Sequence, residues 1–171
     1  MHTQRKKTTL SLERFKTIVL ILASGLLSAT ALAQPLKSAP EVHVVYMGGN
    51  DCPPCVFWRL EELPKLKATA EFARVKFSYV EKVVRSQVPP RFLLPVEVKP
   101  LKEKLDYASS GRSGSPQVAI VVDGEVFDYF WGSRTAQDYE RMLTAIHTGT
   151  EYPFRRCIKV SRHGQGCEIR P

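Results

Sequence analysis

The sequence predicts an α/β protein, with helices packed against a central β-sheet, and two observations carry this prediction. First, residues 41–80 contain a strand-like segment, a helix-like segment and a second strand-like segment, in that order. Second, Asp123-Gly124 separates two further strand-like segments and is typical of a tight hairpin turn. The 171 residues are 43% hydrophobic and 25% charged, an ordinary globular composition that excludes a fibrous or wholly disordered protein.

Residues 1–33 have the pattern of a secretory signal peptide and are excluded from the predicted fold. Five lysines and arginines, all within residues 5–16, precede an apolar segment, residues 18–33, that closes on Ala31-Leu32-Ala33. The pattern predicts export to a bacterial periplasm, with cleavage after Ala33 and a short linker at residues 34–40. The alternative is an uncleaved inner-membrane anchor. The apolar segment is sixteen residues long, however, and falls short of the roughly 20 residues that span a bilayer.

The net charge of +8 divides equally between residues 1–33 and the rest of the chain. Residues 34–171 therefore carry a net charge of only +4. So small an excess of basic residues does not indicate a nucleic-acid-binding surface. We expect no nucleic-acid partner.

The first strand is predicted at residues 42–47, which are rich in β-branched and aromatic side chains. Gly48-Gly49-Asn50-Asp51 ends the strand, and this loop leads into Cys52-Pro53-Pro54-Cys55. A helix with a kink at Pro64 follows. Its apolar residues have helical spacing: Val56, Leu60, Leu63, Leu66 and Ala70. A second strand is predicted at residues 75–80.

Residues 83–99 contain three prolines and predict an irregular connection. A short helix follows, with Leu101, Leu105 and Ala108 facing inward, and then the hairpin strands 117–122 and 125–131. The last helix begins near Thr135 and ends at Gly149. Its apolar face is formed by Ala136, Tyr139, Leu143 and Ile146. The predicted domain covers residues 41–150, and residues 151–171 form a C-terminal extension.

A Cys-x-x-Cys pair at the start of a helix is chemically meaningful, because free N–H groups and the helix dipole favour a thiolate there. In its β-α-β context, with a later hairpin and closing helix, the pair resembles the thioredoxin superfamily. Gly114-Ser115-Pro116, Asp123-Gly124 and Gly132 resemble the family's cis-proline loop, hairpin and closing turn. The resemblance implies a three-layer fold with a central mixed sheet, to which this chain adds a C-terminal hairpin containing cysteines.

The resemblance also implies the roles of individual residues. Cys52 is the exposed nucleophile that attacks a substrate disulfide, and Cys55 resolves the mixed disulfide. Pro116 is a cis proline packed against the dithiol, and Ser115 offers backbone groups to an extended substrate peptide. The implied partners are exported proteins with thiols or disulfides, and a membrane or periplasmic redox partner. No organic cofactor and no metal is required.

Two positions depart from the family pattern. Tyr46 stands where many members have a buried acid, and Asp51 replaces the aromatic residue before the first cysteine. An ionised Asp51 close to Cys52 disfavours the thiolate, and Pro53 and Pro54, in the first helical turn, remove N–H donors that could face its sulfur. We therefore expect a Cys52 pKa less depressed than in the strongest oxidants, which favours a reductase or isomerase.

In an oxidising compartment, Cys157 and Cys167 are expected to form a structural disulfide within the C-terminal hairpin. The alternative is a second redox pair that passes electrons to Cys52 and Cys55. Two other functions stay open: a module whose dithiol binds a soft metal such as Cu(I), and a component of an envelope assembly. His43 and His147 are expected on strand and helix surfaces.

Overall fold

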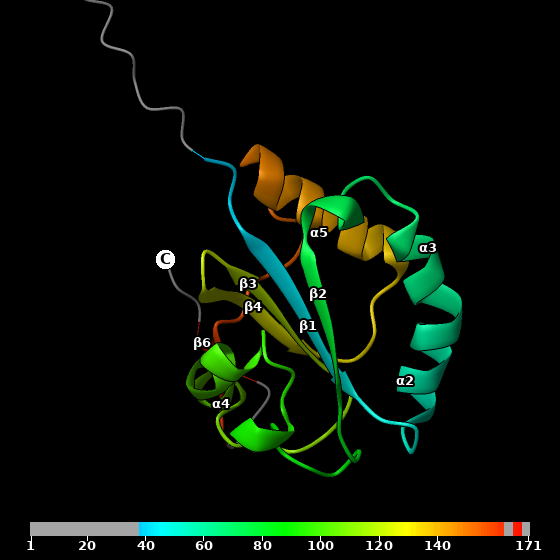
Figure 1. Cartoon of the computed structure of the whole chain (residues 1–171). Coiled ribbons are helices and arrows are strands. Elements are labelled where there is room, and N and C mark those ends of the chain that lie inside the picture. Colours follow the sequence, from blue (N-terminus) through cyan, green and yellow to red (C-terminus); the bar gives the residue numbers. More distant parts are fainter. Residues whose placement is uncertain (1–37, 163–165, 169–171) are drawn as a thin grey trace, which may run out of the picture. The chain divides into compact units, whose positions relative to one another are not determined.

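The described part of the chain folds around a four-stranded mixed sheet with strand order β2-β1-β3-β4 (Figure 1). The structure is a computed structural model that describes residues 38–162 and 166–168. The predicted signal peptide, residues 34–37 of the predicted linker and residues 163–165 of the C-terminal hairpin lie outside the described residues.

The central strand β1 is parallel to β2 and antiparallel to β3, and β3 is antiparallel to β4. The strands are β1 (Val42–Gly48), β2 (Lys76–Glu81), β3 (Gln117–Val122) and β4 (Glu125–Trp131). These bounds confirm the four predicted strands. Every residue of β1 is buried because both faces of the sheet are covered.

Helices lie on both sides of the sheet. They are α2 (Pro53–Phe57), η1 (Trp58–Glu62), α3 (Leu63–Lys67), η2 (Phe72–Arg74), η3 (Arg91–Leu93), η4 (Lys99–Leu101), α4 (Lys102–Ser109) and α5 (Ala136–Thr148). Because successive side chains of β1 point to opposite faces, Tyr46 packs in one core cluster with residues of α3 and α5. Met47 packs in a second cluster with residues of α4. The mixed α/β architecture predicted from the sequence is confirmed.

The helix after the dithiol buries a different face from the one that its apolar spacing predicts. Leu63 and Leu66 are buried, but Leu60 is 63% exposed and Ala70 is exposed, whereas Trp58 is fully buried. The reason is η1, a π-helical turn that ends at Glu62, two residues before Pro64. A π-turn adds one residue to the helical repeat and shifts the inward face by one position.

Local chemistry fixes the hairpin and the closing helix where the sequence predicts them. Asp123 (φ 50°) and Gly124 (φ 78°) have the positive backbone angles of a tight two-residue hairpin turn. Thr135 caps the N-terminus of α5 through a hydrogen bond from the Asp138 N–H to its hydroxyl, and Gly149 ends the helix in the left-handed conformation.

The C-terminal extension is attached to β4 through a buried aspartate. β5 (Lys159–Val160) pairs antiparallel with β6 (Cys167–Glu168), and a disulfide joins Cys157 to Cys167, as predicted. The carboxylate of Asp128 accepts hydrogen bonds from the Cys157 N–H (2.8 Å) and the Tyr152 hydroxyl (3.0 Å). Burial raises the pKa of Asp128, and these bonds partly oppose the shift.

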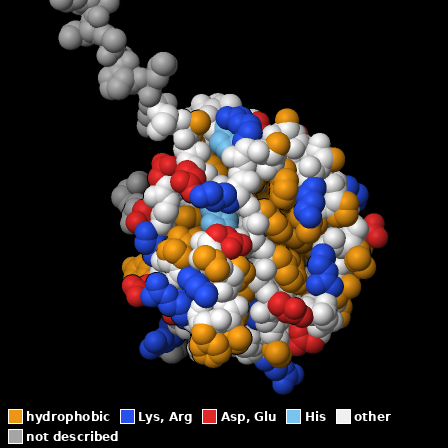
Figure 2. Space-filling view, in the orientation of Figure 1, with side chains coloured by type: hydrophobic (Ala, Val, Ile, Leu, Met, Phe, Trp, Pro, Cys, Tyr) orange, Lys and Arg blue, Asp and Glu red, His pale blue; other side chains and the backbone are white. Residues whose placement is uncertain are grey.

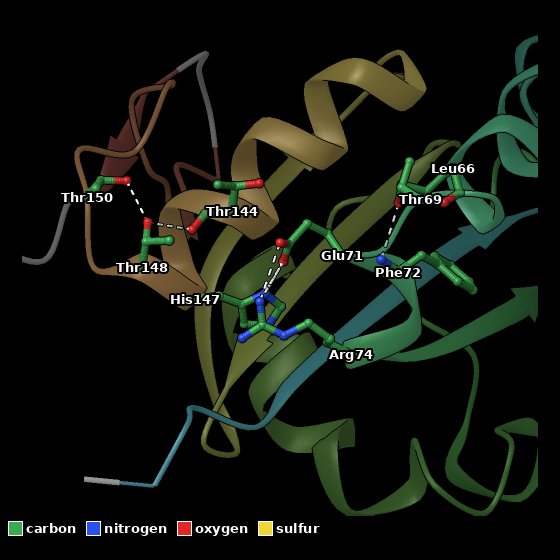
Figure 3. A network of polar contacts seen from close by, with 9 residues as sticks. All are labelled: Leu66, Thr69, Glu71, Phe72, Arg74, Thr144, His147, Thr148 and Thr150. Carbon is green, nitrogen blue, oxygen red and sulfur yellow. Dashed lines mark hydrogen bonds and ion pairs between the residues drawn. The ribbon is translucent and has the colours of Figure 1, made fainter. Parts of the chain in front are cut away.

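The two histidines expected on surfaces both have buried side chains. The side chain of His147 is 2% exposed and contacts the carboxylate of Glu71, which also pairs with Arg74 at 3.3 Å (Figure 3). His43 shares a 2.9 Å hydrogen bond with Ser78, and burial lowers its pKa. The expectation was wrong because Glu71, the N-cap residue of η2, contacts the His147 ring, and because both faces of the sheet that contains His43 are covered.

Candidate active site

The dithiol lies at the end of the central strand, where β1 passes into α2. Cys52 is the N-cap residue of α2, and Pro53 and Pro54 occupy its first turn, as expected. The Cys55 and Val56 N–H groups donate hydrogen bonds of 2.9 and 3.0 Å to the Cys52 carbonyl. Cys52 and Cys55 form a disulfide, with their Cα atoms 5.2 Å apart. The fold thus places the Cys52–Cys55 disulfide at the N-terminus of α2.

Both sulfur-bearing residues are fully buried, so the expectation of an exposed Cys52 is wrong for this disulfide form. The loop before Cys52 is packed too closely for side chains at its two glycines. A Cβ at Gly48 would lie 2.7 Å from the Cys55 Sγ, and one at Gly49 would lie 2.2 Å from the Lys82 carbonyl oxygen. The chain that leaves β2 therefore passes directly against this loop.

Asp51 is engaged with that same passing chain. Its Oδ2 accepts a hydrogen bond of 2.9 Å from the Val84 N–H. The side chain of Val84 packs against the core cluster that contains Cys52 and Cys55. Asp51, expected to act on the thiolate by its charge, thus also has a structural role.

Lys82 is a site residue that the sequence reasoning missed. It is only 5% exposed, and its Nζ donates a 2.7 Å hydrogen bond to the Gly114 carbonyl. Burial lowers its pKa to about 8, while the negative charge of Asp51 acts in the opposite direction. The available signal was the period-two pattern of β2 continued by one residue past its end: Ser78, Val80 and Lys82 fall on one face and are all buried.

Lys82 brings the loop that carries Ser115 and Pro116 to the end of β2. The Ser115–Pro116 peptide bond is cis, as expected from the resemblance. The Pro116 carbonyl accepts a 3.1 Å hydrogen bond from the Gly132 N–H, which places Gly132 beside this loop. The Ser115 Oγ is buried and finds no hydrogen-bond partner among the described residues.

Tyr46 occupies the position at which many members of the thioredoxin superfamily have a buried acid. Its ring is fully buried and stacks on Trp58 with centroids 4.1 Å apart. Its hydroxyl lies 3.3 Å from the Ser133 Oγ, which in turn lies 3.4 Å from the Pro54 carbonyl between the two cysteines. Burial raises the Tyr46 pKa to about 12, so the phenol is neutral at physiological pH.

An apolar cleft of about 730 Å³ begins at the dithiol loop. Gly49, Asn50 and Asp51 of the dithiol loop line it. It is also lined by residues that follow β2: Val83, Ser86, Val88, Pro89, Pro90 and Leu93. Val83 and Leu93 are 64% and 63% exposed, and hydrophobic side chains reach the surface among charged ones in Figure 2. Part of the irregular connection, residues 83–99, thus borders the dithiol loop and part lines the cleft.

The two disulfides lie on opposite faces of the sheet. Cys52 and Cys55 pack in the cluster with Tyr46, whereas Cys157 packs in the cluster with Met47. A direct exchange between the pairs would have to cross the sheet. This separation favours a structural role for the Cys157–Cys167 disulfide over an electron relay.

Within residues 38–162 and 166–168, no three His, Cys, Asp or Glu side chains gather as a ligand set for a metal. No helix in this part of the chain is long and apolar enough to cross a bilayer. Comparisons with protein-family models, with curated proteins and with solved structures find no significant match.

Proposed function

We propose that the protein is a thioredoxin-like thiol-disulfide oxidoreductase that exchanges disulfides in exported, periplasmic proteins. The single observation that carries the proposal is the Cys52–Cys55 disulfide at the N-terminus of α2, directly after the central strand. A helix N-terminus favours the thiolate that exchange requires. The loop with Ser115 and Pro116, tied to the end of β2 through Lys82, supports the assignment of these residues to substrate binding.

In the reductive direction, the reduced protein passes two electrons to its client. The Cys52 thiolate attacks one sulfur of the client disulfide, the client S–S bond breaks, and one client cysteine leaves as a thiolate that takes up a proton. The Cys55 thiolate then attacks the Cys52 sulfur, breaks the mixed disulfide and releases the second client cysteine. The protein ends as the Cys52–Cys55 disulfide, and a membrane or periplasmic dithiol reductant restores it.

The direction of exchange follows from how well the site stabilises the Cys52 thiolate. Pro53 and Pro54 provide no N–H groups, and no side chain caps the N-terminus of α2. A weakly stabilised thiolate makes the dithiol a better reductant, because a strong oxidant needs a stabilised reduced form. This supports a reductase or isomerase. Neither role requires an organic cofactor.

The redox equilibrium of the Cys52–Cys55 pair tests the proposal. The protein is equilibrated in thiol buffers of graded potential, alkylated, and its cysteines are counted by mass spectrometry. We expect a potential near or below about −230 mV, whereas a value near about −120 mV would identify a disulfide donor. Cys52→Ser should abolish reduction of a disulfide-containing test protein, and Cys167→Ser serves as the matched control. Equal activity of Cys52→Ser and the parent would refute the proposal.

The complete burial of both sulfurs favours one competing function, an envelope-assembly component that keeps the Cys52–Cys55 bond closed. Such a protein would retain its biological function in Cys52→Ser. It would also keep the disulfide oxidised in cells that contain active periplasmic reductants. Trapping with alkylating reagents in intact cells distinguishes the two functions, because an oxidoreductase cycles through the free dithiol.

A further inference from the structure

The chain directly after β2 extends beyond the sheet and packs against the loop that precedes Cys52. The β1–β2 ladder pairs Gly48 with Glu81, and the Lys82 N–H then donates a 3.1 Å hydrogen bond to the Gly48 carbonyl. The close approach of the Lys82 carbonyl to Gly49 leaves no room for a side chain between them. Residues 82–84, called the cover below, therefore lie against the dithiol loop, residues 48–51.

The cover has an inner and an outer side. Val83 is 64% exposed and lines the apolar cleft, while Val84 is partly buried and packs against the cluster that holds both cysteines. The chain turns here: the Ser86 N–H donates a 2.9 Å hydrogen bond to the Val83 carbonyl, which closes a turn over residues 83–86. The valine that faces the dithiol cluster is the one whose N–H is held by Asp51.

Two side chains tie the cover down from different directions. Asp51 holds Val84 through the 2.9 Å bond to its N–H, and Lys82 holds the loop before Pro116 through the 2.7 Å bond to the Gly114 carbonyl. A hydrogen bond to a charged group is stronger than one between neutral groups. The Asp51 bond is the tie that directly links the residue before Cys52 to the cover.

We infer that residues 82–84 form a cover that closes access to Cys52, and that Asp51 is a positioning residue that holds it closed. The inference rests on the proposed function only in treating Cys52 as the reacting sulfur. An incoming thiolate must reach a sulfur atom in order to exchange with it, and Cys52 is fully buried in the closed arrangement. Exchange therefore follows a displacement of the cover, which breaks the Asp51–Val84 bond.

The test is the rate at which a small dithiol, dithiothreitol, reduces the Cys52–Cys55 bond in the full protein. We expect Asp51→Ala to raise this rate about tenfold or more. Asp51→Asn separates the hydrogen bond from the charge, because its side-chain oxygen still accepts from the Val84 N–H while the negative charge beside Cys52 is gone. We expect Asp51→Asn to stay within about threefold of the parent.

Asp138→Ala is the matched control, since Asp138 also accepts a hydrogen bond from a backbone N–H, that of Thr135 at 3.2 Å, at another place in the fold. It should leave the rate unchanged. Val84→Ala is a second, independent variant that removes inner contact of the cover without changing charge, and it should also raise the rate. Amide exchange at Val84 should accelerate in Asp51→Ala and not in Asp51→Asn.

Equal rates for Asp51→Ala and Asp51→Asn would overturn the inference, because the charge alone would then explain both. The inference would also be overturned if dithiothreitol reduced the parent as fast as it reduces Val84→Ala and Asp51→Ala. These measurements use a small reductant, so they are independent of client turnover. A parent that reduces a test protein while all variants match it would refute the cover but not the function. Faster reduction of Asp51→Ala with no activity toward any client disulfide would refute the function but not the cover.

Discussion

The ammonium group of Lys82 donates a hydrogen bond to the Gly114 carbonyl at 2.7 Å and thereby joins the end of β2 to the loop of Ser115 and Pro116. The same carbonyl accepts a 2.8 Å bond from the Gln117 side chain. No carboxylate of the described residues forms an ion pair with Lys82, although Asp51 acts on it at longer range. A buried lysine with a carbonyl as its partner is costly while it is charged.

Lys82→Met keeps most of the buried stem and removes the charge, which predicts a pH-dependent difference in stability. The pKa of Lys82 is lowered to about 8 in the folded protein, so between about pH 8 and pH 10.5 the unfolded chain binds more protons at this position. The cost of the charged amine is therefore present below pH 8 and is lost as the pH rises. We expect wild type to gain stability relative to Lys82→Met by up to about 3 kcal/mol across this window.

Denaturant unfolding of both proteins at pH 7, 8, 9 and 10 measures this difference. Comparing the two proteins at each pH cancels the titration of the buried tyrosines, which both share. A difference that is constant with pH, or that moves in favour of Lys82→Met as the pH rises, would contradict the lowered pKa.

Gly49→Ala is predicted to disrupt the dithiol loop, because the added Cβ would lie 2.2 Å from the Lys82 carbonyl, which belongs to the backbone and cannot rotate away. Overpacking of this kind typically costs about 1–3 kcal/mol and sometimes more. Gly132→Ala is the matched comparison: it meets nothing within 4 Å but has φ 89°, so its cost of about 1–2 kcal/mol is conformational. Only Gly49→Ala should also change the rate at which the Cys52–Cys55 bond is reduced. Thermal unfolding and dithiothreitol reduction of both variants provide the two readouts.

Removing the second disulfide should affect stability and leave exchange intact. Cys157 and Cys167 are ten residues apart in sequence, and closing a loop of this length stabilises a fold by about 3 kcal/mol in the chain-entropy description. The double variant Cys157→Ser/Cys167→Ser is expected to lose stability of this order, measured by denaturant unfolding. Its redox potential at Cys52–Cys55 should equal that of the parent, and a shifted potential would instead support a relay between the pairs.

Elements set by local chemistry were predicted to within a residue or two. The β3–β4 hairpin depends on two residues that tolerate positive φ, and α5 depends on a cap at Thr135 and a glycine at position 149, all readable in the sequence. The dithiol, its position at a helix N-terminus and the two prolines of the first turn were found in the same way.

Features that depend on distant packing were not predicted. The π-turn before Pro64 changes which face of the helix is buried, and helical spacing alone assumes a uniform repeat. The resemblance implied an exposed Cys52, and nothing local corrects that expectation, because the segment that lies against its loop comes some thirty residues later. Lys82 and His147 were missed as buried groups for the same reason: a polar side chain is assigned to the surface until its partner is known.

The sheet that separates the two disulfides also bears on how the protein matures. Four cysteines can pair in three ways, and the two wrong ways join a cysteine of the Tyr46 cluster to one of the Met47 cluster. A chain oxidised in that manner cannot complete both layers around β1. Only the native pairing is therefore compatible with the complete sheet and its two layers. In a mispaired chain the cysteines stay accessible to thiol-disulfide exchange until the native pairs form.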